Sequence, residues 1–266
     1  MTDKICTAEE AIRFVKDGDS VAINAWGLTG TPHYLLRALR GSGVKNLTLY
    51  CNNLVRGSAA REEMGLTTVA SLIPQLKKVV VPFIGGRARS GADVEDIFGG
   101  RVEKGEIEIE ASTHGVYIQR FLAGAMGSGG FYSPIGVDTI IEEGKEKRVI
   151  DNTTYILEKP VRPDVGFVKA HTSDKQGNLV YLGTSRASNP IVAIASKLVI
   201  AEVFNIVETG VLDPEAIITP GIYVDHIVKI PEDDISSINR VKEVILMTMR
   251  TRLETETAAA VAAVST

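Results

Sequence analysis

Apolar residues in this chain cluster in short runs separated by glycine, charged residues or turns. Three early runs, Val21–Ile23, Leu47–Tyr50 and Lys78–Phe83, are rich in branched aliphatic residues and predict short buried strands. Glu106–Glu110 alternates glutamate with isoleucine, which is the period of a strand with one solvent-exposed face. Further strands are predicted at Tyr155–Glu158, Val165–Ala170, Leu179–Tyr181, Leu198–Phe204 and Tyr223–Ile230.

Helices are predicted between these strands. Thr7 and Glu10 have the spacing of a capping box and predict a helix start, with Gly18 as the stop. Thr31 is expected to cap a second helix, with Pro32 at its first position, where proline loses no hydrogen bond. Later helices are predicted over Val116–Leu122, Pro190–Lys197 and Ile235–Leu253, the last with a basic polar face.

The order of these elements indicates the fold class. Strands alternate with helices through much of the chain, which is typical of the α/β class. We expect an open, mostly parallel sheet with helices on both faces. No internal repeat and no proline- or serine-rich linker interrupts the pattern. We therefore predict a single α/β domain over residues 1–255, followed by an alanine-rich C-terminal tail over residues 256–266.

Composition narrows the functional classes. The 266 residues are 44% apolar and 23% charged, as in ordinary soluble globular proteins. The formal net charge is −4 and no basic block appears, so we expect no nucleic-acid partner. The scarcity of cysteine, with only Cys6 and Cys51, favours a reducing cytoplasm. No segment has the length and apolarity of a membrane helix, so no membrane partner is expected. The four histidines are scattered without cysteine neighbours, so we expect no metal.

Two glycine-containing segments are candidates for ligand contact. Asp17–Pro32 passes from a strand through a small-residue loop into a helix, whose N-terminus offers backbone N–H groups to an anion. The alternative is a tight turn with no ligand. Gly124–Gly130 holds four glycines and either binds a thioester oxyanion or a phosphate, or packs closely against a neighbouring backbone. Cys51, at a strand end with no nearby base, is expected to be a small buried side chain.

The first of these segments resembles the signature of family I coenzyme A transferases of the 3-oxoacid and glutaconate type, in the subunit called A or alpha. Asp17, Gly18, the triplet Val21–Ile23, Gly30 and Pro32 match that signature. Other segments similar to the family follow in the expected order, at Asn46–Asn53, Gly129–Gly136, Glu143–Glu146, Asp174–Tyr181, Asp213-Pro214 and Thr219–Val228. The resemblance covers nearly the whole chain.

The resemblance implies the coenzyme A transferase fold and a heteromeric enzyme acting on acyl-CoA thioesters. Coenzyme A is then a substrate moiety, and no permanently bound cofactor is expected. In the family, the glutamate that attacks the thioester lies in the other subunit, within a Ser-Glu-Asn-Gly-like motif, and this chain has no such motif. Glu142-Glu143-Gly144 matches an A-type segment instead. The expected partner is therefore a homologous B subunit, in an αβ or α2β2 complex that is inactive without it.

The sequence departs from the family pattern in loops expected to face the site. Asn24, Ala25 and Trp26 replace Gly-Gly-Phe, and Ile84–Arg87 with nearby Arg89 replaces a Val-Gly-Glu-Asn-like loop. His114 stands where the family has the glutamine of Pro-Gln-Gly. Arginine pairs carboxylates bidentately and histidine titrates near neutrality, although surface arginines and a capping histidine are the alternative. We take His114 as the candidate catalytic residue, and the predicted substrate contacts are Asn24, Trp26, Gly27, Arg87, Arg89, Gly129, Gly130 and Phe131.

Three functions fit these residues. The first is transfer of coenzyme A between small carboxylic or dicarboxylic acids by the subunit that lacks the nucleophile. The second function uses the same scaffold for another reaction, either decarboxylation of a glutaconyl-CoA-type thioester such as 3-methylglutaconyl-CoA or hydrolysis of an acyl-CoA. A carboxylate-binding arginine and a proton-carrying histidine would suit decarboxylation. The third is a non-catalytic sensor of coenzyme A or a metabolite. The sequence of the second subunit would separate the first two.

Overall fold

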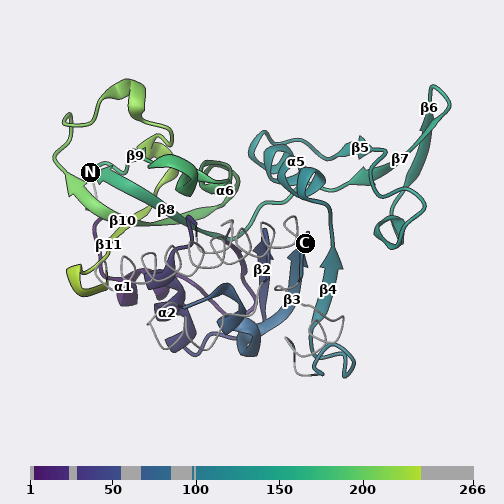
Figure 1. Cartoon of the computed structure of the whole chain (residues 1–266), viewed down its shortest axis with the longest axis horizontal. Coiled ribbons are helices and arrows are strands. Elements are labelled where there is room, and N and C mark those ends of the chain that lie inside the picture. Colours follow the sequence, from purple (N-terminus) through teal and green to yellow (C-terminus); the bar gives the residue numbers. More distant parts are fainter. Residues whose placement is uncertain (1–2, 24–28, 55–66, 85–97, 99, 235–266) are drawn as a thin grey trace, which may run out of the picture.

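In the computed structural model, the described residues are 3–23, 29–54, 67–84, 98 and 100–234 (Figure 1). They form a large sheet with the strand order β11-β10-β8-β1-β2-β3-β4 and a smaller one with the order β5-β7-β6. A short strand, β9, pairs antiparallel with β8. The strands of the large sheet are β1 (Ser20–Ile23), β2 (Leu47–Cys51), β3 (Leu76–Val81), β4 (Glu108–Ala111), β8 (Val165–Asp174), β9 (Leu179–Val180), β10 (Leu198–Val207) and β11 (His226–Lys229).

The strand order reverses at β1. Strands β2, β3 and β4 follow on one side of it, and β8, β10 and β11 follow on the other, with parallel pairing along the whole path. Ile23 at the end of β1 lies between Cys51 of β2 and Phe167 of β8. In open sheets of this kind, ligands bind outside the carboxyl ends of the strands near such a reversal. The predicted open, mostly parallel sheet is confirmed.

Helices cover both faces of the large sheet (Figure 1). Val21 and Ile23 of β1 belong to one apolar cluster with residues of α1 and α2, whereas Ala22 belongs to a second with residues of α5 and α6. This alternation follows from the two-residue period of a strand, which sends successive side chains to opposite faces. The helices are α1 (Ala8–Ile12), α2 (His33–Gly41), α5 (His114–Ala125) and α6 (Asn189–Ala195), with the 3-10 segment η1 (Val69–Gln75) beside α2.

The predicted helices and strands mostly have the correct type of secondary structure, but their first and last residues differ from those in the structure. The capping box of Thr7 and Glu10 is present, but α1 ends at Ile12, and Gly18 instead takes a left-handed turn (φ 85°). Strands β8 and β10 each run for 10 residues because they continue to pair with one another beyond the end of β1. The helix predicted over Ile235–Leu253 lies outside the described residues, and the domain limit at residue 255 stays a prediction. Among the helices that the structure describes, none could span a membrane.

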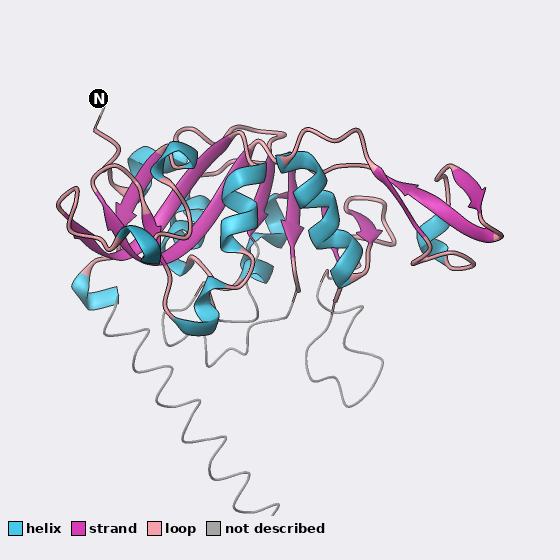
Figure 2. Cartoon of the chain, turned by 90° about the horizontal axis from the view of Figure 1, so that it is seen from above, coloured by secondary structure: helices cyan, strands magenta, loops and turns pink. Residues whose placement is uncertain are grey.

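The small antiparallel sheet extends away from the main body (Figure 2). The sequence pattern predicts only β7 (Thr153–Glu158) and misses β5 (Phe131–Ser133) and β6 (Lys147–Ile150). All four residues of β6 are exposed, so this strand has no alternation of apolar and polar residues to reveal it. Such a small sheet needs support from the rest of the chain.

Arg120 of α5 supplies part of that support. Its Nε donates to the carbonyl oxygen of Lys159 at 2.9 Å, and its Nη1 lies 2.6 Å from Oε1 of Glu110 on β4. Glu158, at the end of β7, is 1% exposed and pairs with Lys145 at 2.6 Å. These contacts connect the edge of the large sheet, α5 and the small sheet.

Asp164 connects the amino ends of β1, β8 and β10 through hydrogen bonds and an ion pair. One oxygen, Oδ2, accepts from the backbone N of Ser20 at 2.9 Å and from its hydroxyl at 2.6 Å. The other, Oδ1, lies 2.7 Å from Nζ of Lys197. Partial burial raises the pKa of Asp164, but the bonds from Lys197 and Ser20 outweigh it and lower this pKa to about 2.

The stability that Asp164 provides should therefore depend on pH. Because its folded pKa lies below that of an unfolded aspartate, the contribution is complete above roughly pH 4 and is lost as the pH falls toward 2. We expect Asp164→Asn to lower the free energy of unfolding at pH 7, with a difference from wild type that shrinks in acid. Urea titrations of both proteins at several pH values would measure this. A difference that stays constant down to pH 2 would contradict the assignment.

Two glycines of α5 provide a matched test of packing. A Cβ on Gly124 would overlap the carbonyl oxygen of Val161, whereas a Cβ on Gly115 would meet no atom within 4 Å. Gly124→Ala should lower the free energy of unfolding by roughly 1–3 kcal/mol through overpacking. Gly115→Ala should raise it by up to about 1 kcal/mol, because alanine favours the helix. Denaturant titration of both variants measures the contrast, and equal effects would contradict it.

A candidate site at the carboxyl edge of the sheet

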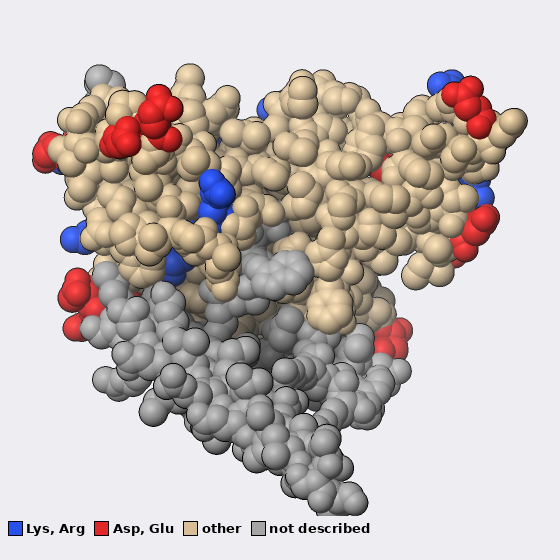
Figure 3. All heavy atoms as spheres, turned by 45° about the horizontal axis from the view of Figure 1, so that its top comes forward, with Lys and Arg blue, Asp and Glu red and all other residues tan. Residues whose placement is uncertain are grey.

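The parallel strands place the loops after β1, β2, β3 and β4 along one edge of the large sheet. The described parts of these loops include Thr29-Gly30, Asn52–Leu54, Pro82–Ile84 and Ser112-Thr113. Leu54 and Ile84 form a parallel bridge, so the loops after β2 and β3 begin side by side. On the face shown in Figure 3, most acidic side chains of the described residues lie toward the ends of the molecule.

The N-terminus of α2 binds an internal carboxylate. Oε2 of Glu202, on β10, accepts from the backbone N of Tyr34 at 2.8 Å and of Leu35 at 3.0 Å. The prediction that Thr31 caps this helix is wrong: the N-cap residue is Pro32, which has no side-chain acceptor. An acceptor distant in sequence fills that role, and it occupies donors that would otherwise be available to a ligand anion.

Glu202 is neutralised by Lys169 of β8. Nζ of Lys169 lies 3.0 Å from Oε1 of Glu202, and both side chains are almost completely buried. The ammonium group also lies 4.8 Å from the centre of the Phe204 ring, where the face of the ring attracts a cation. A buried charge is stable only when it is paired and hydrogen-bonded. Oε2 of Glu202 accepts the two hydrogen bonds, and Oε1 forms the ion pair with Lys169 without a hydrogen bond of its own.

Asn189, at the start of α6, extends this network to Gly30. Its Oδ1 accepts from the backbone N of Lys169 at 3.1 Å. Its Nδ2 lies within hydrogen-bonding distance of the carbonyl oxygens of Gly30 (3.3 Å), Ser185 (3.1 Å) and Arg186 (3.2 Å). Gly30 has a φ of 73°, and a Cβ there would overlap the carbonyl of Ser185. The entry to α2 therefore requires glycine at position 30.

These three polar residues were not predicted from the sequence as elements of a site. Lys169 and Glu202 each stand in the middle of an apolar strand run, and Asn189 precedes an apolar helix. Charged residues are almost never fully buried unless they are paired. A lysine and a glutamate inside two predicted buried strands were therefore a usable signal that those strands lie side by side.

Cys51, the last residue of β2, is a structural residue and not a nucleophile. Cys51 has no exposed surface, and burial raises the pKa of its thiol well above the ordinary value. A buried neutral thiol is a poor nucleophile, as expected for a small core side chain. Asn52, the next residue, is 7% exposed.

His114 is the first residue of α5 and is exposed. It follows β4, which is separated from β1 by β2 and β3, so roughly 14 Å of sheet width lies between the ends of β1 and β4. The N-cap residue Thr113 makes no side-chain capping bond, which leaves the first turn of α5 without a side-chain cap. The structure thus places His114 at the carboxyl edge, on its outermost strand.

Gly129, Gly130 and Phe131 lie elsewhere. They follow α5, whose 12 residues span roughly 18 Å, and they enter β5 of the small sheet. A Cβ on Gly130 would lie 2.7 Å from the carbonyl oxygen of Glu158, and Gly124 packs against Val161. Close backbone packing therefore explains why positions 124 and 130 are glycine. The structure does not bring Gly129, Gly130 and Phe131 to His114.

The other predicted contacts, Asn24, Trp26, Gly27, Arg87 and Arg89, lie outside the described residues. Their loops follow Ile23 and Ile84, which are described and stand at the carboxyl edge.

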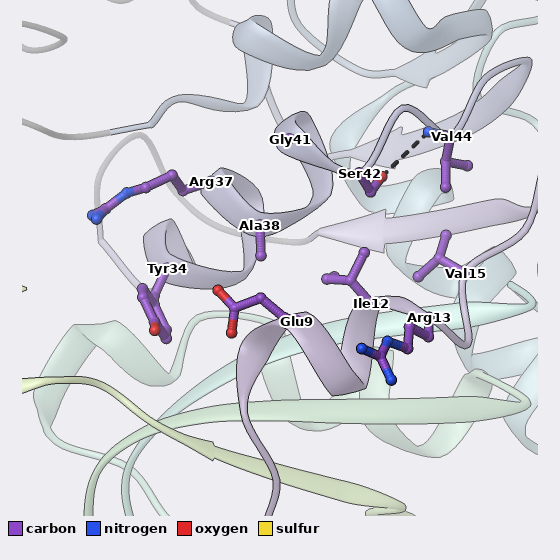
Figure 4. A pocket seen from close by; sticks show the side chains of 10 residues that line it. All are labelled: Glu9, Ile12, Arg13, Val15, Tyr34, Arg37, Ala38, Gly41, Ser42 and Val44. Atoms are coloured by element: carbon purple, nitrogen blue, oxygen red, sulfur yellow. Dashed lines mark hydrogen bonds between the residues drawn. The ribbon is translucent and has the colours of Figure 1, made fainter.

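Two cavities are lined by other described parts of the fold. One, of about 480 Å³, is a groove between α1 and α2 in which Ile12 and Ala38 point toward one another (Figure 4). Arg37, on its rim, pairs with Asp234 at 2.7 Å. The other, of about 790 Å³, lies between β4, α5 and the small sheet and contains the ion pairs of Arg120 and Glu158. Within the described part of the chain, no cluster of side chains is suited to hold a metal ion.

Comparison with known proteins identifies the family. The family model for coenzyme A transferase matches residues 5–230. The chain therefore belongs to the coenzyme A transferase family.

A curated relative shows the same relationship in more detail. This relative is the A subunit of the probable succinyl-CoA:3-ketoacid coenzyme A transferase of Bacillus subtilis. It is 38% identical over 224 residues, which covers 84% of this chain and 88% of the relative.

Solved structures show the fold. An acyl-CoA transferase apoenzyme from Escherichia coli O157:H7 superposes with a TM-score of 0.70 at 19% identity, covering 86% of this chain and 47% of that longer one. A cysteine-to-serine variant of the AibA/AibB decarboxylase superposes with a TM-score of 0.66 at 22% identity, covering 86% of this chain and 84% of the other. At these identities the likeness concerns the architecture and does not separate transfer from decarboxylation.

The buried pair can be tested by mutation. Glu202→Gln keeps the shape of the side chain but leaves Lys169 buried without a counter-charge, so we expect a loss of roughly 3–5 kcal/mol in the free energy of unfolding. Adding Lys169→Met should restore much of it, because the unpaired charge is then gone. Glu208→Gln, which breaks the exposed pair with Lys175, serves as the control and should cost less than about 1 kcal/mol. Urea titration measures the wild type, Glu202→Gln, Lys169→Met, the double variant and the Glu208→Gln control. Additive losses at positions 202 and 169 would refute the pairing.

Proposed function

We propose that this chain is the subunit without the nucleophile in a heteromeric coenzyme A transferase acting on thioesters of small carboxylic or dicarboxylic acids. Coenzyme A leaves one acid and forms a thioester with another, so it is a substrate moiety and no cofactor needs to remain bound. The observation that carries the proposal is the match to the coenzyme A transferase family over residues 5–230, together with a 38% identical relative that is named as the A subunit of such an enzyme.

The state of the buried carboxylates supports a partner that supplies the nucleophile. Among the described residues, Glu202 is occupied by two backbone N–H groups and Lys169. Asp174, also buried, accepts from the backbone of Gln176 and Asn178 and from the amide of Asn178. The third buried carboxylate in the described part of the chain, Glu158, pairs with Lys145. A carboxylate held in this way is not available for attack on a thioester. We infer a homologous B subunit, in an αβ or α2β2 complex, as the source of the attacking group.

We place the acyl-CoA site at the carboxyl edge of the large sheet. The loops after β1 and β3 would contribute Asn24, Trp26, Gly27, Arg87 and Arg89, and α5 would present His114. Arg87 is the group we assign to a second carboxylate on the substrate, because its guanidinium can form two parallel hydrogen bonds with it. Gly129, Gly130 and Phe131 remain candidate contacts on the side of the small sheet. Both cysteines are free thiols, as they would be in the cytoplasm.

The proposal predicts that activity requires two chains. The purified chain alone should not transfer coenzyme A, whereas the chain produced together with the homologous B subunit should transfer it from succinyl-CoA to a 3-oxo acid. The measurement is formation of the new acyl-CoA, with complex mass determined in parallel to separate αβ from α2β2. Robust transfer by the single chain would refute the need for a partner. Release of carbon dioxide from a glutaconyl-CoA without transfer would show that the scaffold is used for decarboxylation.

A further inference from the structure

We infer that the hydroxyl groups of Thr113 and Tyr117 share one buried water molecule beneath the first turn of α5, and that Tyr117 is a positioning residue which, through this water, holds His114 in place. The positioning role rests on the proposed function, because His114 matters only if the carboxyl edge is the acyl-CoA site. The water itself does not depend on that function.

The primary observation concerns hydrogen bonding. Both hydroxyl oxygens are buried, and neither has a hydrogen-bond partner among the described residues. Tyr117 is 0% exposed, and its ring packs against Phe121 with 5.1 Å between ring centres. Burying an unpaired hydroxyl is costly, and folded proteins satisfy such groups with protein atoms or with ordered water.

The two residues are joined at the start of α5. Tyr117 follows Thr113 by four residues, and its backbone N donates to the carbonyl oxygen of Thr113 at 2.8 Å. Long helical side chains lean toward the N-terminus, which directs the ring of Tyr117 toward the first turn of α5. Thr113 is the N-cap residue of that turn, with an extended backbone, and its hydroxyl makes no capping bond.

The chemistry of both groups suits a single water. Desolvation, with smaller effects from Cys51 and Tyr50, raises the pKa of Tyr117 well above its ordinary value, so the phenol stays protonated and donates. The threonine hydroxyl both donates and accepts. A buried water makes two to four hydrogen bonds, typically to groups that would otherwise be unsatisfied, and these two hydroxyls supply the minimum.

The first turn of α5 carries His114, so a water bound beneath this turn would affect the candidate site. His114 lies between Thr113 and Gly115, at the point where β4 gives way to α5. A water bound to Thr113 and Tyr117 would connect the start of the helix to its second turn and limit tilting of the turn that carries the imidazole. Small displacements of a catalytic group have large effects on rate.

A double-mutant cycle on the assembled complex tests the shared water. Tyr117→Phe and Thr113→Val each remove one hydroxyl and keep the side-chain shape. We expect each to lower the Tm by roughly 2–4 °C, and the double variant to be little worse than either, because the second hydroxyl no longer stabilises a water once the first is gone. Tyr181→Phe and Thr219→Val form the matched control cycle, since those two hydroxyls bond directly at 2.8 Å.

Kinetics tests the positioning role separately. Tyr117→Phe and Thr113→Val should lower kcat/KM by roughly tenfold. Thr113→Ser retains the hydroxyl and should restore both Tm and kcat/KM. A shared loss of Tm with unchanged kcat/KM would overturn the positioning role and leave the water. If the wild-type complex shows no transfer activity, the proposed function fails, and the stability cycle still decides the water.

The opposite sign would overturn the inference entirely. If the two hydroxyls are unpartnered in solution, removing either one relieves a desolvation cost. Tyr117→Phe and Thr113→Val would then each raise the Tm, and their effects would add. A crystal structure of the wild-type complex with no density within hydrogen-bonding distance of both hydroxyls would be equally decisive against it.

Discussion

The carboxylate of Glu202 is the constraint on which the centre of this fold depends. It joins β10 to the first turn of α2 and, through Lys169, to β8. These elements meet next to β1, where the strand order of the sheet reverses. A carboxylate without exposed surface is tolerated because two backbone N–H groups bond to one oxygen and an ammonium pairs with the other. The positive end of the α2 dipole is thereby neutralised inside the protein. Any anionic ligand at the carboxyl edge must then be held by other donors, from the strand ends or from arginine side chains.

The repeating parts of the fold could be predicted from sequence because their signals are local. Strand β1 and the capping box of α1 depend on residues within a few positions of one another, and both were found. The cap of α2 could not be found in this way, because Tyr34 and its acceptor Glu202 are 168 positions apart. A nearby threonine was the reasonable local choice, but tertiary structure supplied a stronger acceptor. The small sheet was missed for a different reason: β6 is exposed along its whole length, so no buried face shaped its sequence.

The candidate site could be predicted only in outline. The resemblance to a family suggested which loops matter, and the parallel sheet explains why segments far apart in sequence meet at one edge. The resemblance could not show that α5 separates His114 from Gly129 and Phe131, since a motif order carries no distances. It also could not distinguish a glycine that binds a ligand from one that packs. At Gly124 the carbonyl of Val161 leaves no room for a side chain, so packing alone requires the glycine.

Helix α5 links the edge of the sheet to the small sheet. Its first turn carries His114, and its later residue Arg120 binds on both sides: it pairs with Glu110 on β4 and donates to the carbonyl of Lys159 beside β7. Glu110 also pairs with Lys78 of β3 at 2.8 Å, so the chain of charges runs from β3 to the small sheet. These groups are partly buried, and ion pairs in such positions are screened less by salt than exposed ones. Arg120 therefore connects α5, the helix that carries His114, both to the edge strand β4 and to the chain beside β7.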